Sequence, residues 1–470
     1  MSRPTSFDKK DLLVFLILLL FAPLYFYNLS GHSLVDFDEA WFGEIAKNIL
    51  KSGQPFMPTF NGLPFWDHPP FGFIAMAASI AIFGANEFAV RLPSAISGFL
   101  SLIFTYLIGK KLFGRTVGLG AALILTSYVW LVLRARTGNL DTLLVFLFLA
   151  SFYIATKIKD NVNFIFLLPF SLVALLLTKS MIGLVIIPPI IAYLFLNKVK
   201  VPAQKALLSA LLFLILLAPW FFQNYQKYQL EFINKMVAIG VRTGTKQPIN
   251  FSEIHKSVTF TYLHYGIRKW YYPAIIAAVA SLYFVRKEKN LIPFYLWIVI
   301  LLYGFLTSKK TEIWHLLPLY PPLALLISFC IYRFGNFVIK NKLILSALTL
   351  GSLMFVSLYQ INGFKGEIKL FGHDESGLAK TAKAAQKYPE KLYLDSDLII
   401  PAVVAFYSDK KVNTIRLEPE QQNTLLELFE NTPRPYIVIV EKWKLDLDKI
   451  NPQDYQILSE HQGHLLVKVI

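Results

Sequence analysis

The stretch LLVFLILLLFAPLYFY, residues 12–27, is the first of the apolar runs that decide the fold class of this chain. A helix needs about 17–25 predominantly apolar residues to cross the hydrocarbon core of a bilayer. Of the 470 residues, 55% are hydrophobic and only 16% are charged, and the mean hydropathy is +0.50. A single soluble core cannot be built from this composition, so we expect a polytopic α-helical membrane protein.

Apolar runs of this kind recur up to residue 360, and we expect about eleven membrane spans. The runs lie near residues 11–28, 88–109, 117–135, 141–157, 162–178, 181–197, 205–222, 273–285, 291–307, 316–334 and 342–359. The shortest runs are near the lower limit for a span, so the count depends on them.

Basic residues test these spans, because short cytoplasmic loops carry Lys and Arg whereas the opposite loops need not. If the N-terminus is cytoplasmic, alternate ends of the runs are basic: Lys9–Lys10, Lys110–Arg115, Lys157–Lys159, Lys198–Lys205, Arg286–Lys289 and Arg333–Lys342. We therefore predict a multi-pass protein of the inner (plasma) membrane, with everything after residue 360 extracytoplasmic. These loops account for much of the net charge of +16, so membrane lipids, and not nucleic acid, are the expected partners.

The apolar runs stop between Tyr359 and Glu375, which predicts two domains, residues 1–360 and 361–470. The second domain reads as a small soluble α/β domain, although alternation does not prove parallel strand order. Its β-rich segments are 391–395, 411–416, 436–441 and 465–470, and helical spacing occurs at 398–407 and 419–429. It has no glycine-rich phosphate loop or metal-ligand cluster, so we assign it no chemistry and expect it to cover the site or bind the acceptor.

The first external loop begins with a regular pattern after Asp38. One face carries apolar side chains at three- and four-residue spacing, Trp41, Phe42, Ile45, Ala46 and Ile49, with Glu44, Lys47, Asn48 and Lys51 elsewhere. This pattern predicts an amphipathic helix fit to lie on the membrane surface. N-capping of that helix is the structural alternative to a chemical role for Asp38. A second apolar stretch, residues 71–83, is expected to be interfacial and not spanning.

A series of short motifs runs from this loop through the membrane part. In the loop and just after it they are Asp38–Ala40, Glu44–Ala46, Ser52–Gly53, Pro58–Gly62, Asp67–Pro70, Phe83–Gly84 and Phe88–Ser94. Later ones are Arg136–Asp141, Leu177–Gly183, Ala218–Trp220, Ser308–Lys310, His315–Pro318 and Pro321–Ala324. Together they resemble the membrane glycosyltransferases of the GT-C class, in particular the bacterial branch of lipid A aminoarabinose transferases and relatives of protein O-mannosyltransferases.

The resemblance implies transfer of a sugar from a polyprenyl-phosphate donor to a lipid, glycan or protein hydroxyl at the extracytoplasmic face. Such an attack needs a carboxylate to accept the hydroxyl proton and cations to stabilise the departing phosphate. Asp38 matches the first acidic residue of the family's opening loop and is the candidate general base of an inverting reaction. Glu39 is expected to orient Asp38 or to bind the sugar.

Asp67 matches the second acidic position of the loop, which in the family belongs to a metal site, so a divalent metal ion is the candidate cofactor. His68 stands where the family often has a basic residue, and it is a candidate phosphate contact. A hydrogen bond between the two before a Pro-Pro turn would give the same pattern without metal. The chain also has Asn234–Met236 near the place where aminoarabinose transferases have a histidine, which counts against metal. Another histidine would have to substitute: His255, His264 or His315.

Candidates for binding the leaving phosphate are the basic residues at expected external positions: Arg136, Lys179, Arg242, Arg268, Lys269, Lys309 and Lys310. Arg242 and the Lys309–Lys310 pair match family positions best, and an arginine can hold two phosphate oxygens at once. Solvation or anchoring to lipid phosphates is the structural alternative. We interpret Asp141 as a structural partner of Arg136, and snorkelling to the interface would explain Lys179.

Two other function classes are open from the sequence: a transporter or flippase of a lipid-linked glycan, and a non-catalytic envelope scaffold. A transporter usually has charged residues near the bilayer midplane, whereas these carboxylates cluster in one external loop. A scaffold would not need carboxylates and phosphate-competent bases together on one face. Neither the sugar nor the acceptor can be read from the residues.

Overall fold

The computed structural model describes residues 8–35, 38–244, 254, 257–308, 311–370, 376–395, 401–414, 429, 432–444 and 451–470. The chain forms two compact units, and each is described by itself. The helical unit comprises Met1–Tyr27, Trp66–Gly72 and Arg91–Phe371. The mixed unit comprises Asn28–Phe65, Phe73–Val90 and Gly372–Ile470. The predicted domain boundary near residue 360 stays a prediction.

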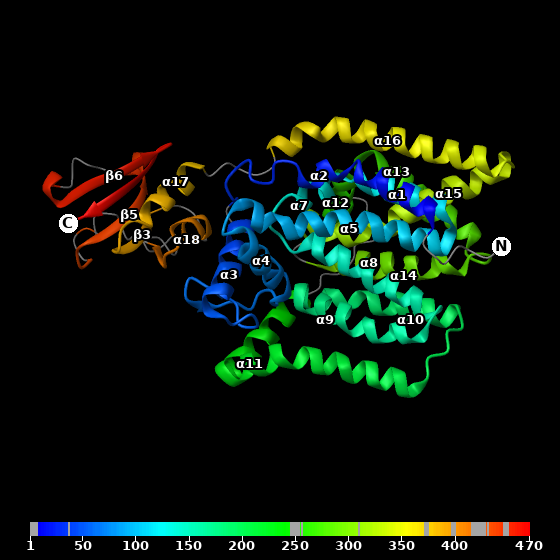
Figure 1. The fold of residues 1–470 in the computed structure, drawn as a ribbon, viewed down its shortest axis with the longest axis horizontal. Helices are drawn as coiled ribbons and strands as arrows, with labels where there is room; N and C mark the ends of the chain where they lie inside the picture. Colours follow the sequence, from blue (N-terminus) through cyan, green and yellow to red (C-terminus); the bar gives the residue numbers. More distant parts are fainter. Residues whose placement is uncertain are drawn as a thin grey trace. The chain divides into compact units, whose positions relative to one another are not determined.

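The helical unit is built almost wholly from α-helices and short 3₁₀ helices (Figure 1). Its α-helices are α1 (Lys9–Leu19), α2 (Ala22–Phe26), α5 (Glu87–Phe113), α6 (Arg115–Thr126), α7 (Val129–Ala135), α8 (Asp141–Ile158), α9 (Leu168–Lys179), α10 (Ile187–Leu196), α11 (Ala203–Gly244), α12 (Val258–Ile267), α13 (Tyr271–Ala280), α14 (Ile292–Thr307), α15 (Tyr320–Val338) and α16 (Lys342–Leu370). Its 3₁₀ helices are η1 (Val162–Leu167), η2 (Ser180–Ile186), η4 (Arg268–Trp270), η5 (Ser281–Phe284), η6 (Lys289–Leu291) and η7 (Ile313–Leu319).

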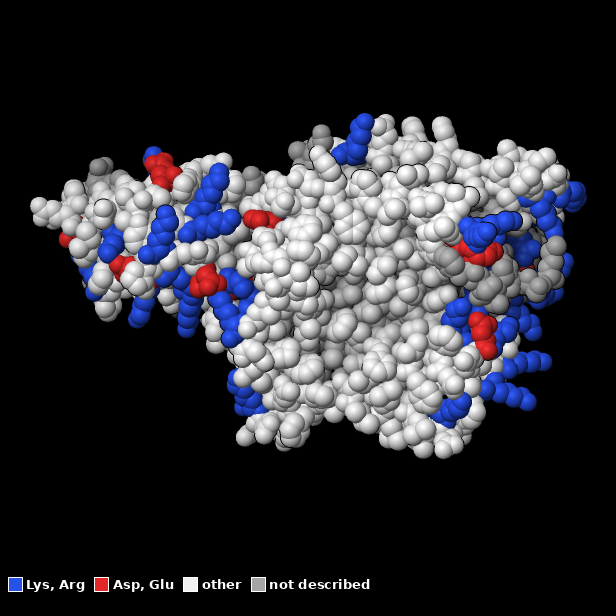
Figure 2. Space-filling model, in the orientation of Figure 1, with Lys and Arg blue, Asp and Glu red and all other residues white. Residues whose placement is uncertain are grey.

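Seven helices within the described residues are long and apolar enough to cross a membrane, or eight if the bent pair α6–α7 forms one span. The two members of that pair meet at 69°. Figure 2 shows a broad uncharged surface over the middle of the helical unit, with Lys and Arg side chains gathered at the end where α1 begins. The expectation of a polytopic helical membrane protein is confirmed, whereas the count of about eleven spans is not.

The chain reverses inside one of these apolar stretches, Val162–Leu196. Ser180 has φ +56° and ψ −141°, a backbone conformation that side-chain-bearing residues rarely adopt. Just after it, Gly183 lies so close to Leu175 that a Cβ on Gly183 would be 2.7 Å from the Leu175 carbonyl carbon. Residues eight apart in a straight helix are separated by about 12 Å. The helices α9 and α10 are therefore two antiparallel arms, at the positions predicted for separate runs.

A second reversal divides α11. Gln229 has φ 47° and ψ −125° within a stretch that is otherwise helical on both sides. The turn brings the ring of Phe232 to 5.6 Å from the ring of Trp220 and 5.6 Å from that of Phe221. Aromatic pairs at such separations stabilise one another beyond their buried area, so these rings hold the two arms of α11 together.

Proline marks the beginning of many of these helices. Pro169, Pro188, Pro293 and Pro321 each occupy the first or second position of α9, α10, α14 and α15, respectively. The first N–H groups of a helix have no intrahelical partner, so a residue without an N–H costs nothing there. The sequence thereby sets where each helix starts.

Small residues let α5, α6 and α15 approach closely. A Cβ on Gly109 of α5 would lie 2.6 Å from the Gly118 Cα of α6, so the two backbones are in direct contact. The Ser328 hydroxyl of α15 donates a 2.8 Å hydrogen bond to the Val117 carbonyl of α6. Small side chains and inter-helix hydrogen bonds of this kind stabilise helix packing where no hydrophobic driving force operates.

The mixed unit combines the first loop with the C-terminal part of the chain. Its elements are α3 (Asp38–Ser52), β1 (Thr59–Phe60), β2 (Leu63–Pro64), α4 (Phe71–Phe83), α17 (Ser376–Ala385), β3 (Lys391–Asp395), α18 (Ala402–Ser408), β4 (Val412–Thr414), β5 (Tyr436–Glu441), η8 (Lys442–Lys444), η10 (Pro452–Asp454), β6 (Tyr455–His461) and β7 (His464–Val469). The five-stranded sheet has the order β4-β3-β5-β7-β6. β3 is parallel to β4 and β5, whereas β7 is antiparallel to β5 and β6.

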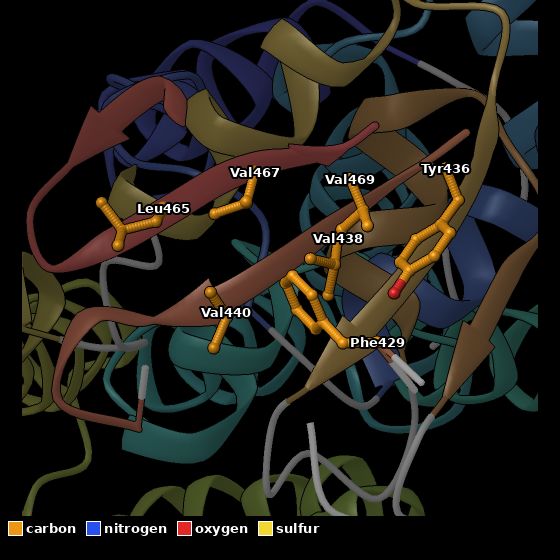
Figure 3. Close-up of a cluster of buried hydrophobic side chains, with 7 residues drawn as sticks. All are labelled: Phe429, Tyr436, Val438, Val440, Leu465, Val467 and Val469. Atoms are coloured by element: carbon orange, nitrogen blue, oxygen red, sulfur yellow. The ribbon is translucent and has the colours of Figure 1, made fainter. Parts of the chain in front are cut away.

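The core of this sheet is a cluster of buried side chains on β5 and β7, together with Phe429 (Figure 3). Its members are Phe429, Tyr436, Val438, Val440, Leu465, Val467 and Val469. The prediction of a small α/β domain is confirmed, and β3 and β5 have the predicted bounds. The predicted helix at 398–407 corresponds to α18, whereas the one at 419–429 lies almost wholly outside the described residues. β6 and α17 were not predicted.

Candidate functional site

The predicted catalytic pair lies in the first turn of α3, in the mixed unit. Asp38 is half-buried and is the first residue of the helix, where a carboxylate interacts favourably with the helix dipole. Glu39 is buried, with 3% of its surface exposed, and its Oε2 accepts a 2.8 Å hydrogen bond from the Val35 N–H. The Ala40 N–H donates in turn to the Val35 carbonyl at 3.0 Å. Glu39 therefore shapes the segment that leads into Asp38.

Helix α3 packs against α18 through a buried lysine. Lys47 Nζ donates a 2.5 Å hydrogen bond to the Phe406 carbonyl and lies 2.7 Å from an Asp409 carboxylate oxygen. It also lies 2.9 Å from Glu44 on its own helix. Glu44 and Lys47 are only 5% and 7% exposed. The apolar face was predicted correctly, but the expectation that these two charges lie away from the buried surface was wrong, because α18 covers them.

The pKa values of the two carboxyl groups beside Lys47 are shifted in opposite directions. Burial raises the pKa of Glu44 above its ordinary value, and the nearby Lys47 only partly opposes this. Burial also acts to raise the pKa of Asp409, but hydrogen bonds from Lys47 and Lys51 outweigh it and lower that pKa. The Lys51–Asp409 distance is 2.6 Å. Asp409 is therefore the charged partner that holds α3 to the end of α18.

Two further contacts join the first loop to the C-terminal part within the mixed unit. The Tyr407 hydroxyl accepts a 2.8 Å hydrogen bond from the Leu34 N–H and donates a 2.7 Å bond to Glu87 Oε1. The Asn61 side chain donates to the Val412 carbonyl at 2.8 Å and accepts from the Val412 N–H at 2.9 Å. The loop on both sides of α3 is thus tied to the C-terminal part.

The second acidic motif lies in the helical unit and is anchored by Trp66. The Trp66 indole N–H donates a 3.1 Å hydrogen bond to the Asn224 side chain of α11, and its ring lies 5.0 Å from that of Tyr228. Asp67 and His68 follow it and are half-buried. Among the described residues, no three His, Cys, Asp or Glu side chains are grouped so that they could hold a metal ion. The metal site predicted at Asp67 stays a prediction, since His255, one of the candidate ligands, lies outside the described residues.

Three of the predicted phosphate ligands lie outside the described side chains. Lys309 and Lys310 are outside the described residues, and for Arg242 the structure describes only the backbone, near the end of α11. Arg136 is described, and it donates hydrogen bonds to the carbonyls of Leu24 and Tyr27 at 3.2 and 2.8 Å. Arg136 therefore ties the end of α7 to α2 and the residue that follows it.

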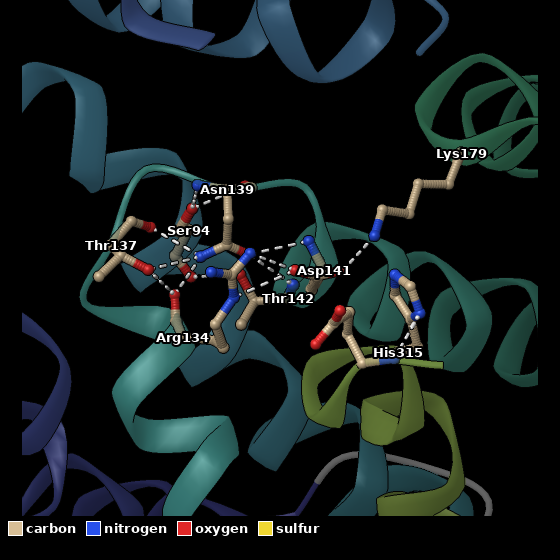
Figure 4. A network of polar contacts seen from close by, with 9 residues as sticks. Ser94, Arg134, Thr137, Asn139, Asp141, Thr142, Lys179 and His315 are labelled. Atoms are coloured by element: carbon tan, nitrogen blue, oxygen red, sulfur yellow. Dashed lines mark hydrogen bonds and ion pairs between the residues drawn. The ribbon is translucent and has the colours of Figure 1, made fainter. Parts of the chain in front are cut away.

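Asp141 pairs with Arg134 and Lys179, and not with Arg136 as we had predicted (Figure 4). Asp141 Oδ2 accepts from Arg134 Nη2 at 2.6 Å and from its Nε at 3.1 Å, while Oδ1 pairs with Lys179 Nζ. Asp141 is only 2% exposed. The explanation of Lys179 by snorkelling is wrong, because the lysine forms a largely buried ion pair.

Neutral side chains complete this network in Figure 4. The Asn139 carbonyl accepts a 2.9 Å hydrogen bond from the Ser94 hydroxyl of α5, and its Oδ1 accepts a 2.8 Å bond from the Asp141 N–H. The Arg134 guanidinium lies 4.8 Å from the centre of the Trp314 ring of η7. The network fixes α7, α8 and α9 to one another and holds two cations against one carboxylate. The one sequence signal for it was the presence of two arginines just before Asp141.

Comparison with known proteins gives a family match for part of the chain. Residues 67–222 match the family described as dolichyl-phosphate-mannose-protein mannosyltransferase. An uncharacterized protein of Aquifex aeolicus (strain VF5) is 26% identical over 68% of this chain and 63% of its own length. An undecaprenyl phosphate-alpha-4-amino-4-deoxy-L-arabinose arabinosyl transferase of Pseudomonas savastanoi pv. phaseolicola is 33% identical. That match covers 32% of this chain and only 29% of the relative.

Solved structures share the fold over nearly the whole chain. ArnT from Cupriavidus metallidurans bound to undecaprenyl phosphate superposes with a TM-score of 0.76 at 15% identity, covering 98% of both chains. The archaeal oligosaccharyltransferase AglB from Archaeoglobus fulgidus, in complex with an inhibitory peptide and a dolichol-phosphate, has a TM-score of 0.57 at 11% identity. It covers 92% of this chain and 69% of AglB. The family match, the relatives and the shared fold together support a GT-C glycosyltransferase that resembles the aminoarabinose transferases and the protein O-mannosyltransferases.

Proposed function

We propose that the protein transfers a sugar from a polyprenyl-phosphate donor to a hydroxyl group of a lipid, glycan or protein. The observation that carries this proposal is the fold shared over 98% of both chains with ArnT, which was solved with undecaprenyl phosphate bound. The Pseudomonas relative that is 33% identical is named as an aminoarabinosyl transferase that uses an undecaprenyl phosphate donor, which adds support.

The proposed base is Asp38. Its carboxylate accepts the proton of the acceptor hydroxyl while that oxygen attacks the anomeric carbon of the sugar. The bond from the anomeric carbon to the phosphate oxygen breaks, and polyprenyl phosphate leaves with the electron pair. A single displacement inverts the anomeric centre. Glu39, through its bond to the Val35 N–H, positions the segment before Asp38 and is a positioning residue in this proposal.

Cations are proposed to stabilise the departing phosphate. His68, Arg242, Lys309 and Lys310 stay the candidates for direct contact. The cluster of Arg134, Lys179 and Asp141 holds one more positive than negative charge, and this excess favours an anion nearby. A divalent ion at Asp67 also stays a proposal, and no step described here passes through it.

The reaction is proposed to take place at the extracytoplasmic face. Asp141 begins α8 and Lys179 ends α9, so both lie at the opposite end of the bundle from the basic segment Lys157–Lys159. Basic loops favour the cytoplasmic side. The proposed donor site then opens toward the outer leaflet.

The test uses the purified full chain in lipid nanodiscs with a panel of radiolabelled polyprenyl-phosphate sugars and a native membrane extract. We expect label to pass from one donor to an extractable lipid, a glycan or a protein band, which identifies the acceptor class. Asp160→Asn, at an exposed ion pair with Lys111, serves as a folded control. An intact protein that binds no donor and transfers no label from a broad panel would contradict the proposal.

A further inference from the structure

A cavity of about 340 Å³ lies in the helical unit, between the short turn that joins α12 to α13 and the last turns of α16. Its lining residues are Arg268, Lys269, Tyr359, Gln360, Asn362 and Gly363. In Figure 1, α12, α13 and α16 are drawn along the same edge of the helical unit. Two cations and several polar groups therefore surround a space at the edge of the bundle.

A buried glutamine fixes the wall of this cavity. Gln360 is 4% exposed, and its Nε2 donates to the Ser127 carbonyl at 2.5 Å and to the Ile267 carbonyl at 3.2 Å. Its Oε1 accepts a 2.9 Å hydrogen bond from the Lys269 N–H. The Trp270 indole N–H donates to the Ser127 hydroxyl at 2.8 Å. The turn that carries the two cations is thereby held in place by α16 and by the bend between α6 and α7.

The turn stores backbone strain at one of the two cations. Arg268 has φ 48° and ψ −110°, a region in which glycine is favoured and a side-chain-bearing residue costs about 1–3 kcal/mol. Such strain persists only where the surroundings impose it, and it is found preferentially at ligand-binding positions. The surroundings therefore hold the backbone at Arg268 in one conformation, which fixes where its side chain starts.

The cavity has an excess of positive charge. Arg268 Nη2 lies 2.6 Å from a Glu367 carboxylate oxygen, so one carboxylate faces two cations. A guanidinium has five N–H donors, and this bond uses one of them. Lys269 Nζ lies 6.0 Å from the centre of the Tyr359 ring, close to the edge of the cavity. The remaining donors suit a phosphate group.

The two helices next to the lining residues carry exposed apolar side chains. On α16, Phe355 and Tyr359 are 72% and 60% exposed, and on α13, Tyr272 and Ile276 are 66% and 65% exposed. α16 is one of the helices long and apolar enough to cross a membrane, and large hydrophobic side chains exposed on such a helix contact lipid chains. A free phosphate ion would use only the polar end of this surface, whereas a phospholipid would use both the cations and the apolar flanks.

We propose that this cavity binds the phosphate headgroup of an anionic glycerophospholipid, with its acyl chains along Phe355 of α16 and Ile276 of α13. The lipid is assigned to the leaflet opposite the basic residues Lys340 and Lys342, since the lining residues of α16 lie toward the end of the helix that is farther from them. The proposal assigns Arg268 and Lys269, which the sequence offered as ligands of the leaving phosphate, to a bound lipid. Its test reads lipid binding and does not depend on the proposed activity.

The test measures retained lipid by native mass spectrometry of the full chain after delipidation and re-addition of defined lipids. Phosphatidylglycerol is the probe, and phosphatidylcholine, inorganic phosphate and undecaprenyl phosphate are the comparison arms. Loss of charge-assisted hydrogen bonds in the double variant Arg268→Gln/Lys269→Gln should weaken phosphatidylglycerol binding by at least about tenfold. Lys365→Gln, an exposed lysine of α16 that does not line the cavity, should bind as the wild type does.

Equal retention of phosphatidylglycerol by the wild type and the double variant would overturn the proposal. Equal binding of phosphatidylcholine would also overturn it. Competition by inorganic phosphate alone would assign the cavity to free phosphate, and displacement of the lipid by undecaprenyl phosphate would assign it to a polyprenyl phosphate; either result would contradict the proposal. If the double variant does not fold, Lys269→Gln alone is used, since this exposed side chain leaves the strained turn intact. The affinity of Lys269→Gln for phosphatidylglycerol is expected to fall, on a logarithmic scale, by about half as much as that of the double variant.

Discussion

Tyr407, a residue that is only 3% exposed, connects the loop of the proposed base to the C-terminal part through its hydroxyl group. In Tyr407→Phe, the Leu34 N–H and the Glu87 carboxylate lose their shared partner. An unsatisfied buried polar group costs about 1–3 kcal/mol, so we expect faster hydrogen exchange in α3 and α18 by that free energy. Tyr388→Phe, at a half-buried tyrosine of the same unit, is the control. Unchanged protection in Tyr407→Phe would show that the hydroxyl does not hold the loop.

Asp409 gives the α3–α18 contact a pH dependence of known sign. Lys47 and Lys51 lower its pKa, so its contribution to stability is present above the ordinary pKa and is lost as the pH falls through the lowered value. The partly exposed pair is worth about 0.5–1 kcal/mol near pH 6. The stability gap between the wild type and Asp409→Asn, measured by hydrogen exchange of α3 with correction for intrinsic rates, should therefore shrink below about pH 4.

Glu44 acts in the opposite direction and supplies a check. Its raised pKa means a contribution that is present below the ordinary pKa and is lost as the pH rises through the raised value. In the background of Asp409→Asn, the protection of α3 should then decline as the pH rises. A gap between the wild type and Asp409→Asn that widens in acid would contradict the assignment of Asp409.

Among the elements, α7, α8 and α9 depend on the buried charge network at Asp141. Removing this carboxylate leaves Arg134 and Lys179 without their anion, which costs about 3–5 kcal/mol at a buried pair. We expect Asp141→Asn to lower the thermal midpoint in detergent strongly, and Lys179→Met in the same chain to restore part of the loss. Additive losses in the double variant would contradict the network, and Asp160→Asn should change the midpoint little.

The arginine that pairs with Asp141 in this network could not be predicted from the sequence. Arg134 and Arg136 are two residues apart, and residues at this spacing do not lie on the same side of a helix. Sequence order put Arg136 nearer to Asp141, but the chain turns between α7 and α8, and only Arg134 faces back. A side chain's direction at a helix end depends on the turn that follows, which a single sequence does not specify.

Segments that are unbroken apolar runs were located well. The apolar stretch noted at residues 71–83 is helix α4, and the buried strand β5 has its predicted bounds because such a run is distinctive. β6 was missed because it is an edge strand with mostly exposed or half-buried side chains, so it lacks a buried face. The reversal at Ser180 falls between two predicted runs and has Gly183 just after it, whereas the reversal at Gln229 has no glycine or proline beside it and was missed.

At the scale of the whole molecule, the distribution of basic residues predicts the orientation in the membrane. In a Cys330→Ala background, we expect Lys383→Cys to react with an impermeant maleimide in intact cells and Lys200→Cys to react only after permeabilisation. Both lysines are exposed, so access to the reagent and not burial decides the result. The opposite labelling pattern would reverse the predicted topology.

Two observations lead to the proposal that Asp38 is the base of a sugar transfer: the fold shared with ArnT and the acidic first turn of α3. The most direct test is single-turnover transfer from a bound polyprenyl-phosphate sugar by the wild type and Asp38→Asn at matched donor occupancy. General base catalysis contributes about 10²–10⁴-fold, so we predict a loss of that size with donor binding unchanged, and a wild-type rate for Asp160→Asn. Transfer by Asp38→Asn at the wild-type rate would contradict the account.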